Sequence, residues 1–185
     1  MDQDLITASR DGHLETVKTF LEKGANIDSR NNYGRTALMY ASRDGHFEIV
    51  KTLLEKGANV DSRDKYGWTA LMRASRYGKF EIVKTLLEKG ANVDSRSNHG
   101  WTALMGASMN GHLETVKTLL DKGANTLLVY TKGETACQLA SKPEIKAVLQ
   151  RAEREQRINM LATLRRIRFR EFGPEWAPTP NNFNE

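Results

Sequence analysis

The side chains of this chain best suited to chemistry are tyrosines, tryptophans and arginines that stand at matching places, 33 residues apart. Arg35, Trp68 and Trp101 occupy one such place, and Tyr40 and Arg73 occupy another. These residue types combine a large contact area with a charged or hydrogen-bonding group, and they dominate the energetics of binding surfaces. The chemistry that they predict is recognition of a partner, not the making or breaking of bonds.

Trp68 and Trp101 also admit a second interpretation, in which each indole stacks on a base of a nucleic acid or nucleotide and nearby arginines add contacts. The chain has no glycine-rich loop of the kind that cradles phosphates, and its formal net charge is only +5. This alternative therefore ranks second. A steep loss of binding between low and moderate salt would favour it.

The sequence contains no recognisable motif for catalysis or metal binding. His13, His46 and His112 recur at one place of the pattern and are separated by whole repeats, which does not suit a shared metal ion. The one cysteine, Cys137, is interpreted as a small buried apolar residue. No HExxH motif or nucleophile elbow is present. We expect no enzyme, no cofactor and no metal site.

The elements that position these residues come from an internal repeat. Residues 31–63, 64–96 and 97–129 are near-copies of 33 residues each, a period typical of a solenoid. We interpret the shared letters as scaffold and the differing letters as a guide to the binding surface. The first two copies differ only at Asn31/Asp64, Asn32/Lys65, Arg35/Trp68, Tyr40/Arg73, Asp44/Tyr77 and His46/Lys79.

Each copy predicts two helices separated by turns. In residues 64–96, Thr69 is a suitable N-cap for a helix over 70–76 that ends at Gly78. A second helix is expected from Phe80 to Lys89, followed by Gly90 in a left-handed conformation. This second helix carries an apolar stripe that neighbouring units must cover, formed by Ile82, Val83, Leu86 and Leu87.

In these features the units resemble ankyrin repeats, although Thr69-Ala70-Leu71-Met72 stands where that family usually has Thr-Pro-Leu-His. The resemblance implies an all-α ankyrin-repeat solenoid of helix-turn-helix units joined by β-hairpin-like turns, plus a C-terminal helix. It is carried by Gly67, Thr69, Ala70, Leu71, Ala74, Gly78, Val83, Leu86, Leu87 and Gly90–Asp94, and by their equivalents in the other copies.

We expect five repeat units, of which the first and the last are modified, followed by two further segments. The domains are an N-terminal capping repeat at 1–30, full repeats at 31–63, 64–96 and 97–129, a modified C-terminal repeat at 130–149 whose second helix starts at Pro143, a basic C-terminal helix at 150–172 and a flexible tail at 173–185.

The resemblance also implies a function, because ankyrin arrays usually bind proteins through a concave surface made of turn tips and first helices. It implies a non-catalytic adaptor or inhibitor, and the basic, aromatic surface suits an acidic or phosphorylated segment of a partner protein. The boundary arginines Arg30, Arg63 and Arg96 are expected to add to its positive charge. The implied partner-binding residues are Tyr33, Arg35, Tyr40, Arg43, Lys65, Tyr66, Trp68, Arg73, Arg76, Tyr77, His99, Trp101 and Met109.

Residues 150–172 combine helix-forming residues with apolar side chains at helical spacing and four arginines within six residues. Three interpretations stay open: a helix packed on the end of the array, a helix that binds a partner or a second copy of the chain, and a basic segment for membranes, nucleic acid or nuclear import. Trp176 and Phe183 of the tail are candidate anchors. The second-interface candidates are Ile158, Leu161, Leu164, Arg165, Arg166, Arg168 and Arg170.

The composition and the N-terminal residues indicate the cellular compartment. A single cysteine cannot form an intramolecular disulfide, which fits a reducing compartment. The first ten residues are polar and acidic, unlike a signal peptide, and no apolar run approaches the roughly 18 residues of a membrane span. We expect an intracellular, cytoplasmic location, with the nucleus as an alternative.

Overall fold

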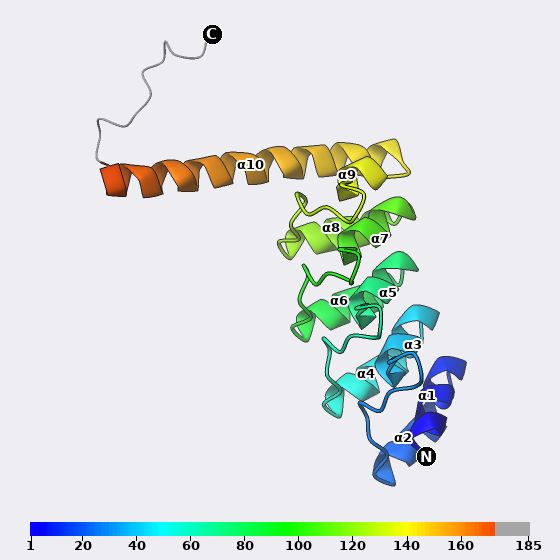
Figure 1. Cartoon of the computed structure of the whole chain (residues 1–185). Coiled ribbons are helices and arrows are strands. Elements are labelled where there is room, and N and C mark those ends of the chain that lie inside the picture. The colour runs from blue at the N-terminus through cyan, green and yellow to red at the C-terminus, as the bar shows by residue number, and fades with distance from the viewer. Residues whose placement is uncertain (173–185) are drawn as a thin grey trace.

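The computed structural model describes residues 1–172, and the expected tail at 173–185, with Trp176 and Phe183, lies outside the described residues. The helices stack as successive pairs along one array (Figure 1). They are α1 (Asp2–Asp11), α2 (Leu14–Glu22), α3 (Ala37–Asp44), α4 (Phe47–Glu55), α5 (Ala70–Arg76), α6 (Phe80–Glu88), α7 (Ala103–Met109), α8 (Leu113–Asp121), α9 (Ala136–Leu139) and α10 (Pro143–Phe172).

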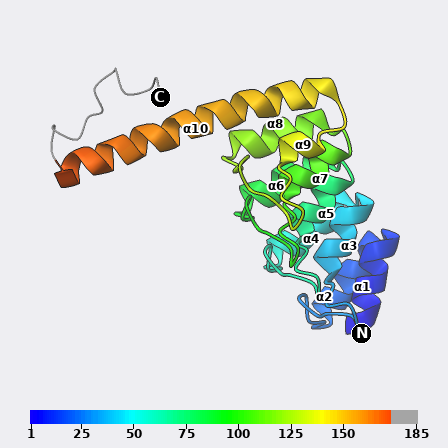
Figure 2. The same ribbon diagram turned by 45° about the horizontal axis from the view of Figure 1, so that its top comes forward.

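The helices form two rows. The first helices of the units, α1, α3, α5, α7 and α9, pack on one another in sequence order, and the second helices, α2, α4, α6, α8 and the start of α10, do the same beside them (Figure 2). This confirms an all-α solenoid of helix-turn-helix units. Within residues 1–172 no strand forms, and neighbouring turn tips are joined by single backbone bonds, such as Lys65 N to Tyr33 O at 3.0 Å.

The helix bounds follow from local sequence. The Thr69 hydroxyl accepts the backbone N–H of Met72 at 3.3 Å, which satisfies one of the free donors at the start of α5. The predicted cap and the predicted range of α5 are confirmed. Helix α6 ends at Glu88, one residue earlier than expected, because Lys89 forms its cap.

Glycine is required between the helices of a unit for two reasons. Gly78 has a φ of +64°, a conformation that residues with a side chain rarely adopt. A Cβ at this position would also lie 2.5 Å from the imidazole of His112 in the next unit. The turn between α5 and α6 therefore allows the next unit to approach closely.

The core runs the length of the array as a continuous layer. Leu53, Leu86 and Leu119 recur at one place of the repeat and are wholly buried. The predicted apolar stripe of α6 is buried as expected, with Ile82 and Val83 also in the core. Because each unit is covered by its neighbours, stability depends on the stacking of units.

Charged residues that recur at the unit boundaries join one unit to the next. Asp61 Oδ1 accepts the backbone N–H of Asn92 at 3.0 Å, and the Arg63 guanidinium donates to the carbonyl oxygen of Arg96 at 2.6 Å. The same bonds recur from Asp28, Asp94, Arg30 and Arg96. The boundary arginines, which were expected to add positive charge to the binding surface, therefore also join neighbouring units.

Helix α10 is both the second helix of the last unit and the C-terminal extension, without a break between them. Ile145 and Leu149 are wholly buried against the array. Farther along, Gln156 accepts the backbone N–H of Thr126 at 3.0 Å and donates to the carbonyl oxygen of Ala124 at 2.8 Å. Beyond Gln156 the helix extends past the array (Figures 1 and 2). Between residues 1 and 172, none of the helices, α10 included, could span a lipid bilayer.

Candidate protein-binding surface

Six of the predicted binding residues line a single pocket of about 260 Å³ where the 31–63 and 64–96 units meet. Arg35 comes from the turn before α3, while the others come from the turn before α5, from α5 itself and from its C-cap. We call this site the arginine pocket. Its lining residues are Arg35, Tyr66, Trp68, Arg73, Arg76 and Tyr77.

A buried carboxylate organises the arginine pocket. Asp64 Oδ1 accepts the backbone N–H groups of Tyr66 and Trp68, each at 2.9 Å, which shapes the turn tip. Asp64 Oδ2 accepts a hydrogen bond from Arg73 and lies 3.7 Å from Nε of Arg35. The Asp64 side chain has no exposed surface. One carboxylate thus fixes the turn and pairs with arginines from two units.

The same two places of the repeat are also in contact in the preceding unit, with different chemistry. Asn31 Nδ2 donates to the Tyr40 hydroxyl at 3.0 Å, where the 64–96 unit has the Asp64–Arg73 pair. Both side chains of each pair differ between the two copies. Two of the six differences between these copies are therefore a single coupled change.

Guanidinium groups cover the aromatic rings of this surface. The Arg73 and Arg76 guanidiniums lie 5.8 and 5.6 Å from the centre of the Trp68 ring. In the preceding unit, Arg35 lies 5.2 Å from the Tyr33 ring and Arg43 lies 5.0 Å from the Tyr40 ring. These cation–π contacts hold arginines in place without neutralising their charge.

The side chains differ in how far they are available to a partner. Tyr66 and Tyr77 are about half exposed, at 51% each, and Arg76 is exposed as well. Arg73 is only 9% exposed. Burial, helped by the nearby charge of Arg35, lowers the pKa of Arg73. The surface therefore has an exposed aromatic rim and a buried cationic base.

The remaining predicted residues do not line this pocket. Lys65 and His99 are exposed on turn tips, and Met109 is exposed at the end of α7. Trp101 is half-buried and packs edge-on against Tyr130, with ring centres 5.1 Å apart. Its indole N–H is buried and has no acceptor among the described residues. Trp101 thus contributes to packing of the last units.

Asp64 is the residue that our sequence analysis did not place in the site. A signal was present, because Asp64 and Arg73 are both among the six differences and carry opposite charges. The sequence does not show that they touch, since nine residues separate them and the contact depends on the turn before α5.

The recurring histidines contribute to contacts between units. Nε2 of His46 lies 2.8 Å from the carbonyl oxygen of Arg10, and Nε2 of His112 lies 3.1 Å from that of Arg76. Cys137 is buried in α9. In the part of the chain that the structure describes, no three His, Cys, Asp or Glu residues come together as a metal site would require.

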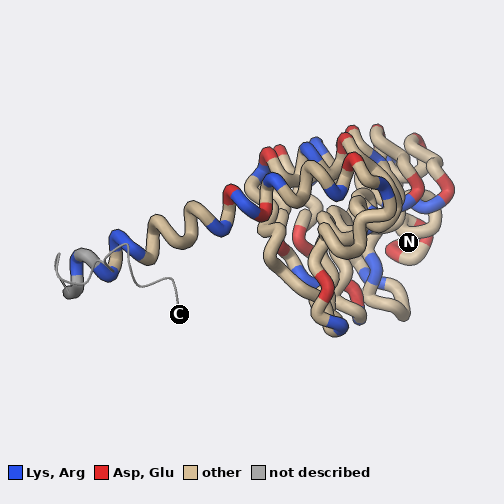
Figure 3. The backbone as a smooth tube through the Cα atoms, turned by 90° about the horizontal axis from the view of Figure 1, so that it is seen from above, with Lys and Arg blue, Asp and Glu red and all other residues tan. Residues whose placement is uncertain are grey.

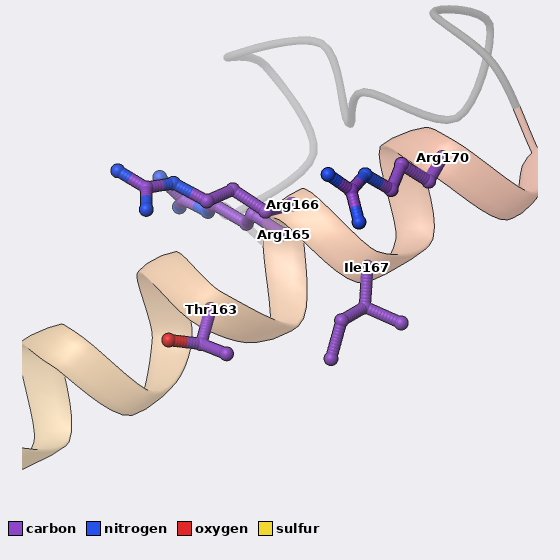
Figure 4. A pocket seen from close by; sticks show the side chains of 5 residues that line it. All are labelled: Thr163, Arg165, Arg166, Ile167 and Arg170. Atoms are coloured by element: carbon purple, nitrogen blue, oxygen red, sulfur yellow. The ribbon is translucent and has the colours of Figure 1, made fainter.

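The candidates for a second interface lie on the part of α10 that leaves the array. Ile158 is 64% and Leu161 54% exposed, which rules out the interpretation that these side chains pack on the end of the array. Between residues 157 and 170 this part of the helix carries arginines and has no Asp or Glu (Figure 3). Arg166 and Arg170 extend on one side, and Ile167 points away from them (Figure 4).

Comparison with known proteins identifies the repeat. Residues 5–97 and 57–130 match the family model of ankyrin repeats, which describes three copies of the unit. The two matches overlap and together cover residues 5–130, more than half of the chain. No curated protein matches the chain.

Proposed function

The chain belongs to the ankyrin repeat family. We propose that it is a non-catalytic adaptor or inhibitor that binds a partner protein. The binding surface would be the arginine pocket and its neighbours Tyr33, Tyr40 and Arg43. Ankyrin repeats are generally protein-interaction modules, and the family is typically non-catalytic. The observation that carries the proposal is the arginine pocket itself, where exposed tyrosines surround clustered arginines.

An acidic segment is the partner that this surface favours. Arg43 is paired with Asp44 at 2.7 Å, and Asp64 is shared by Arg35 and Arg73. Arg76 is exposed and forms no ion pair with another described residue, so the surface keeps an excess of positive charge. Complementary charge would steer an acidic partner toward it and fix its orientation.

The surface is also ordered before binding. The turn tips are held by side-chain bonds within each unit and by backbone bonds between units, as at Asn98 N to Tyr66 O at 3.0 Å. A partner then meets side chains that lose little conformational freedom on binding, which favours affinity.

The alternative of base stacking on two tryptophans has less support from these contacts. The Trp68 ring already lies against two guanidiniums, and Trp101 packs against Tyr130. Both indoles are half-buried. The pair does not form two equivalent free platforms of the kind that single-stranded nucleic acids use.

The proposal is tested by capturing partners from a cell lysate on the immobilised full chain and then measuring the affinity of any purified partner. Tyr66→Ala and Tyr77→Ala should each weaken binding by about 2 kcal/mol or more, as hot-spot residues do. Lys84→Ala, on the exposed side of α6, is the control and should bind normally. Equal binding by all variants would place the interface elsewhere.

For the projecting part of α10 we propose a second contact with an acidic region of the same partner. Four exposed arginines end the helix, and a second copy of the chain laid alongside would add more charge of the same sign. Arg165→Gln and Arg166→Gln should therefore lower the affinity for the partner in low salt. A stable dimer in light scattering, lost in Leu161→Gln, would show that a second copy is the occupant instead.

A further inference from the structure

We propose that the arginine pocket binds a phosphate monoester carried on a side chain of the partner protein, with Arg35, Arg73 and Arg76 as its ligands. The inference rests on the proposed function, since the phosphorylated side chain belongs to the protein partner. It goes further by naming the group that is recognised and the side chains that recognise it.

The first argument is the balance of charge in the pocket. Three guanidiniums line it, and Asp64 is the one carboxylate that pairs with them in the described part of the chain. Two positive charges are thus left in excess. A phosphate monoester carries a charge of roughly −1.5 to −2 at neutral pH, which matches that excess better than a single carboxylate does.

The second argument is the number of donors that lack an acceptor. Each guanidinium has five N–H donors, and Asp64 Oδ1 is already engaged with the backbone of Tyr66 and Trp68. Only Oδ2 remains for Arg35 and Arg73. Nε of Arg35 and Nε of Arg73 are buried without a hydrogen-bond acceptor among the described residues. A buried donor without an acceptor costs free energy. An anion with three acceptor oxygens would supply hydrogen-bond acceptors to Arg35 and Arg73.

The third argument is mutual repulsion of the arginines. Arg73 is largely buried, and the positive charges of Arg35 and Arg43 act on it from the neighbouring unit. Asp64 offsets part of this repulsion, and an anion bound beside the arginines would offset more of it. Occupation of the pocket should therefore stabilise the fold as well as the complex.

The fourth argument is the shape and position of the pocket. Its volume of about 260 Å³ leaves room for a side chain behind the phosphate, and the aromatic rings of Tyr66, Trp68 and Tyr77 form its walls. The equivalent place in the next unit has Gly106 and Met109 where the pocket has Arg73 and Arg76. The next unit thus lacks two of the three arginines, and this difference would fix the register of a phosphorylated segment along the array.

The test is a titration of the full chain followed by the NMR signals of the arginine Nε–H groups. The probes are phenyl phosphate, phenyl sulfate, inorganic phosphate and adenosine monophosphate. Phenyl phosphate should shift the signals of Arg35 and Arg73 and bind about tenfold more tightly than phenyl sulfate, because it carries more charge. Inorganic phosphate should bind more weakly than phenyl phosphate, since it leaves the aromatic walls without contact.

Three variants assign the site. Arg76→Gln changes an exposed residue that the fold does not need and should weaken phenyl phosphate by about tenfold, the effect expected for loss of a charged hydrogen bond. Asp64→Asn removes the competing carboxylate and should tighten binding. The double change D64N/R73Y copies the Asn31–Tyr40 pair, keeps the net charge and should weaken binding.

Other outcomes overturn the proposal. Equal affinity for the phosphate and the sulfate, or unchanged binding in both Arg76→Gln and D64N/R73Y, would exclude a phosphate site. Equal affinity for inorganic and phenyl phosphate would indicate a site for free phosphate, and tighter binding of adenosine monophosphate would indicate a nucleotide site. If phosphatase treatment of the partner leaves its Tyr77-dependent binding intact, this inference fails while the proposed function stands. If neither Tyr66→Ala nor Tyr77→Ala has an effect, the proposed function itself fails.

Discussion

Exchanging Asp64 for asparagine and Arg73 for tyrosine transplants the hydrogen-bonded pair of the 31–63 unit into the 64–96 unit. The structure predicts that the two single changes are harmful and that the double change is well tolerated. The reason is that Asp64–Arg73 and Asn31–Tyr40 occupy the same two places, and each pair satisfies the same contact in its own way.

The magnitudes follow from what each single change leaves behind. Arg73→Tyr leaves a carboxylate with no exposed surface, for which breaking a buried pair costs about 3–5 kcal/mol. Arg35 and two backbone N–H groups remain near Asp64, so we expect the low end, about 3 kcal/mol. Asp64→Asn leaves Arg73 without its counter-ion and should cost about 1–3 kcal/mol. The double change should cost about 1 kcal/mol, which implies a coupling of about 3–5 kcal/mol.

The assay is urea unfolding of the original chain, the two single variants and the double variant, followed by far-ultraviolet circular dichroism. The free energies of unfolding are compared where the dependence on urea concentration (the m-value) is the same for all four. Arg76→Gln is the matched control, because it removes an arginine of the same pocket that does not pair with Asp64. If the two single changes add to the double change within about 0.5 kcal/mol, the pair is not coupled and the reasoning is refuted.

Three further predictions concern other parts of the chain. Tyr77→Ala should reduce partner binding by about 2 kcal/mol or more without changing the melting temperature, since its side chain is half exposed; a lowered melting temperature would argue for a packing role instead. Leu149→Ala should cost about 2–5 kcal/mol of unfolding free energy in urea, because Leu149 is wholly buried, whereas Leu161→Ala should cost less than about 0.5 kcal/mol; similar costs would mean that α10 packs along its whole length. Burial raises the pKa of the Cys137 thiol, so alkylation of the folded protein should be slow, and because the folded thiol holds its proton more tightly, stability should fall as pH rises through its titration; rapid alkylation without unfolding would contradict this.

The repeat architecture could be predicted from the sequence because its determinants are local. Thr69 caps the helix that follows it directly, and Gly78 permits a turn where it stands. The apolar stripe of α6 required no knowledge of its partners, since any neighbouring unit would cover it. Such features depend on a few neighbouring residues and can therefore be predicted from the sequence.

The arrangement of the binding surface could be predicted only in part. The sequence showed which places differ between copies, but not that Asp64 and Arg73 form one pair or that the Arg63 guanidinium is bound to a backbone carbonyl. These facts depend on how a turn tip and a helix end meet across a unit boundary. The predicted domain boundary divided α10 between residues 149 and 150, although neither glycine nor proline between Pro143 and Gly173 interrupts the helix.

The bonds at the unit boundaries also bear on how the length of this array can change. Arg30, Arg63 and Arg96 each donate to a backbone carbonyl 33 residues farther along, and every residue type offers that acceptor. Recombination between near-identical gene segments could thus insert or delete one whole unit and leave every boundary chemically complete. An insertion of a few residues would instead move the acceptor carbonyls away from the arginine donors that bind them. A duplicated 64–96 unit would bring its own copy of Asp64 and Arg73, but Trp68 would stand where Arg35 completes the arginine pocket, so the added pocket would have two of the three arginines.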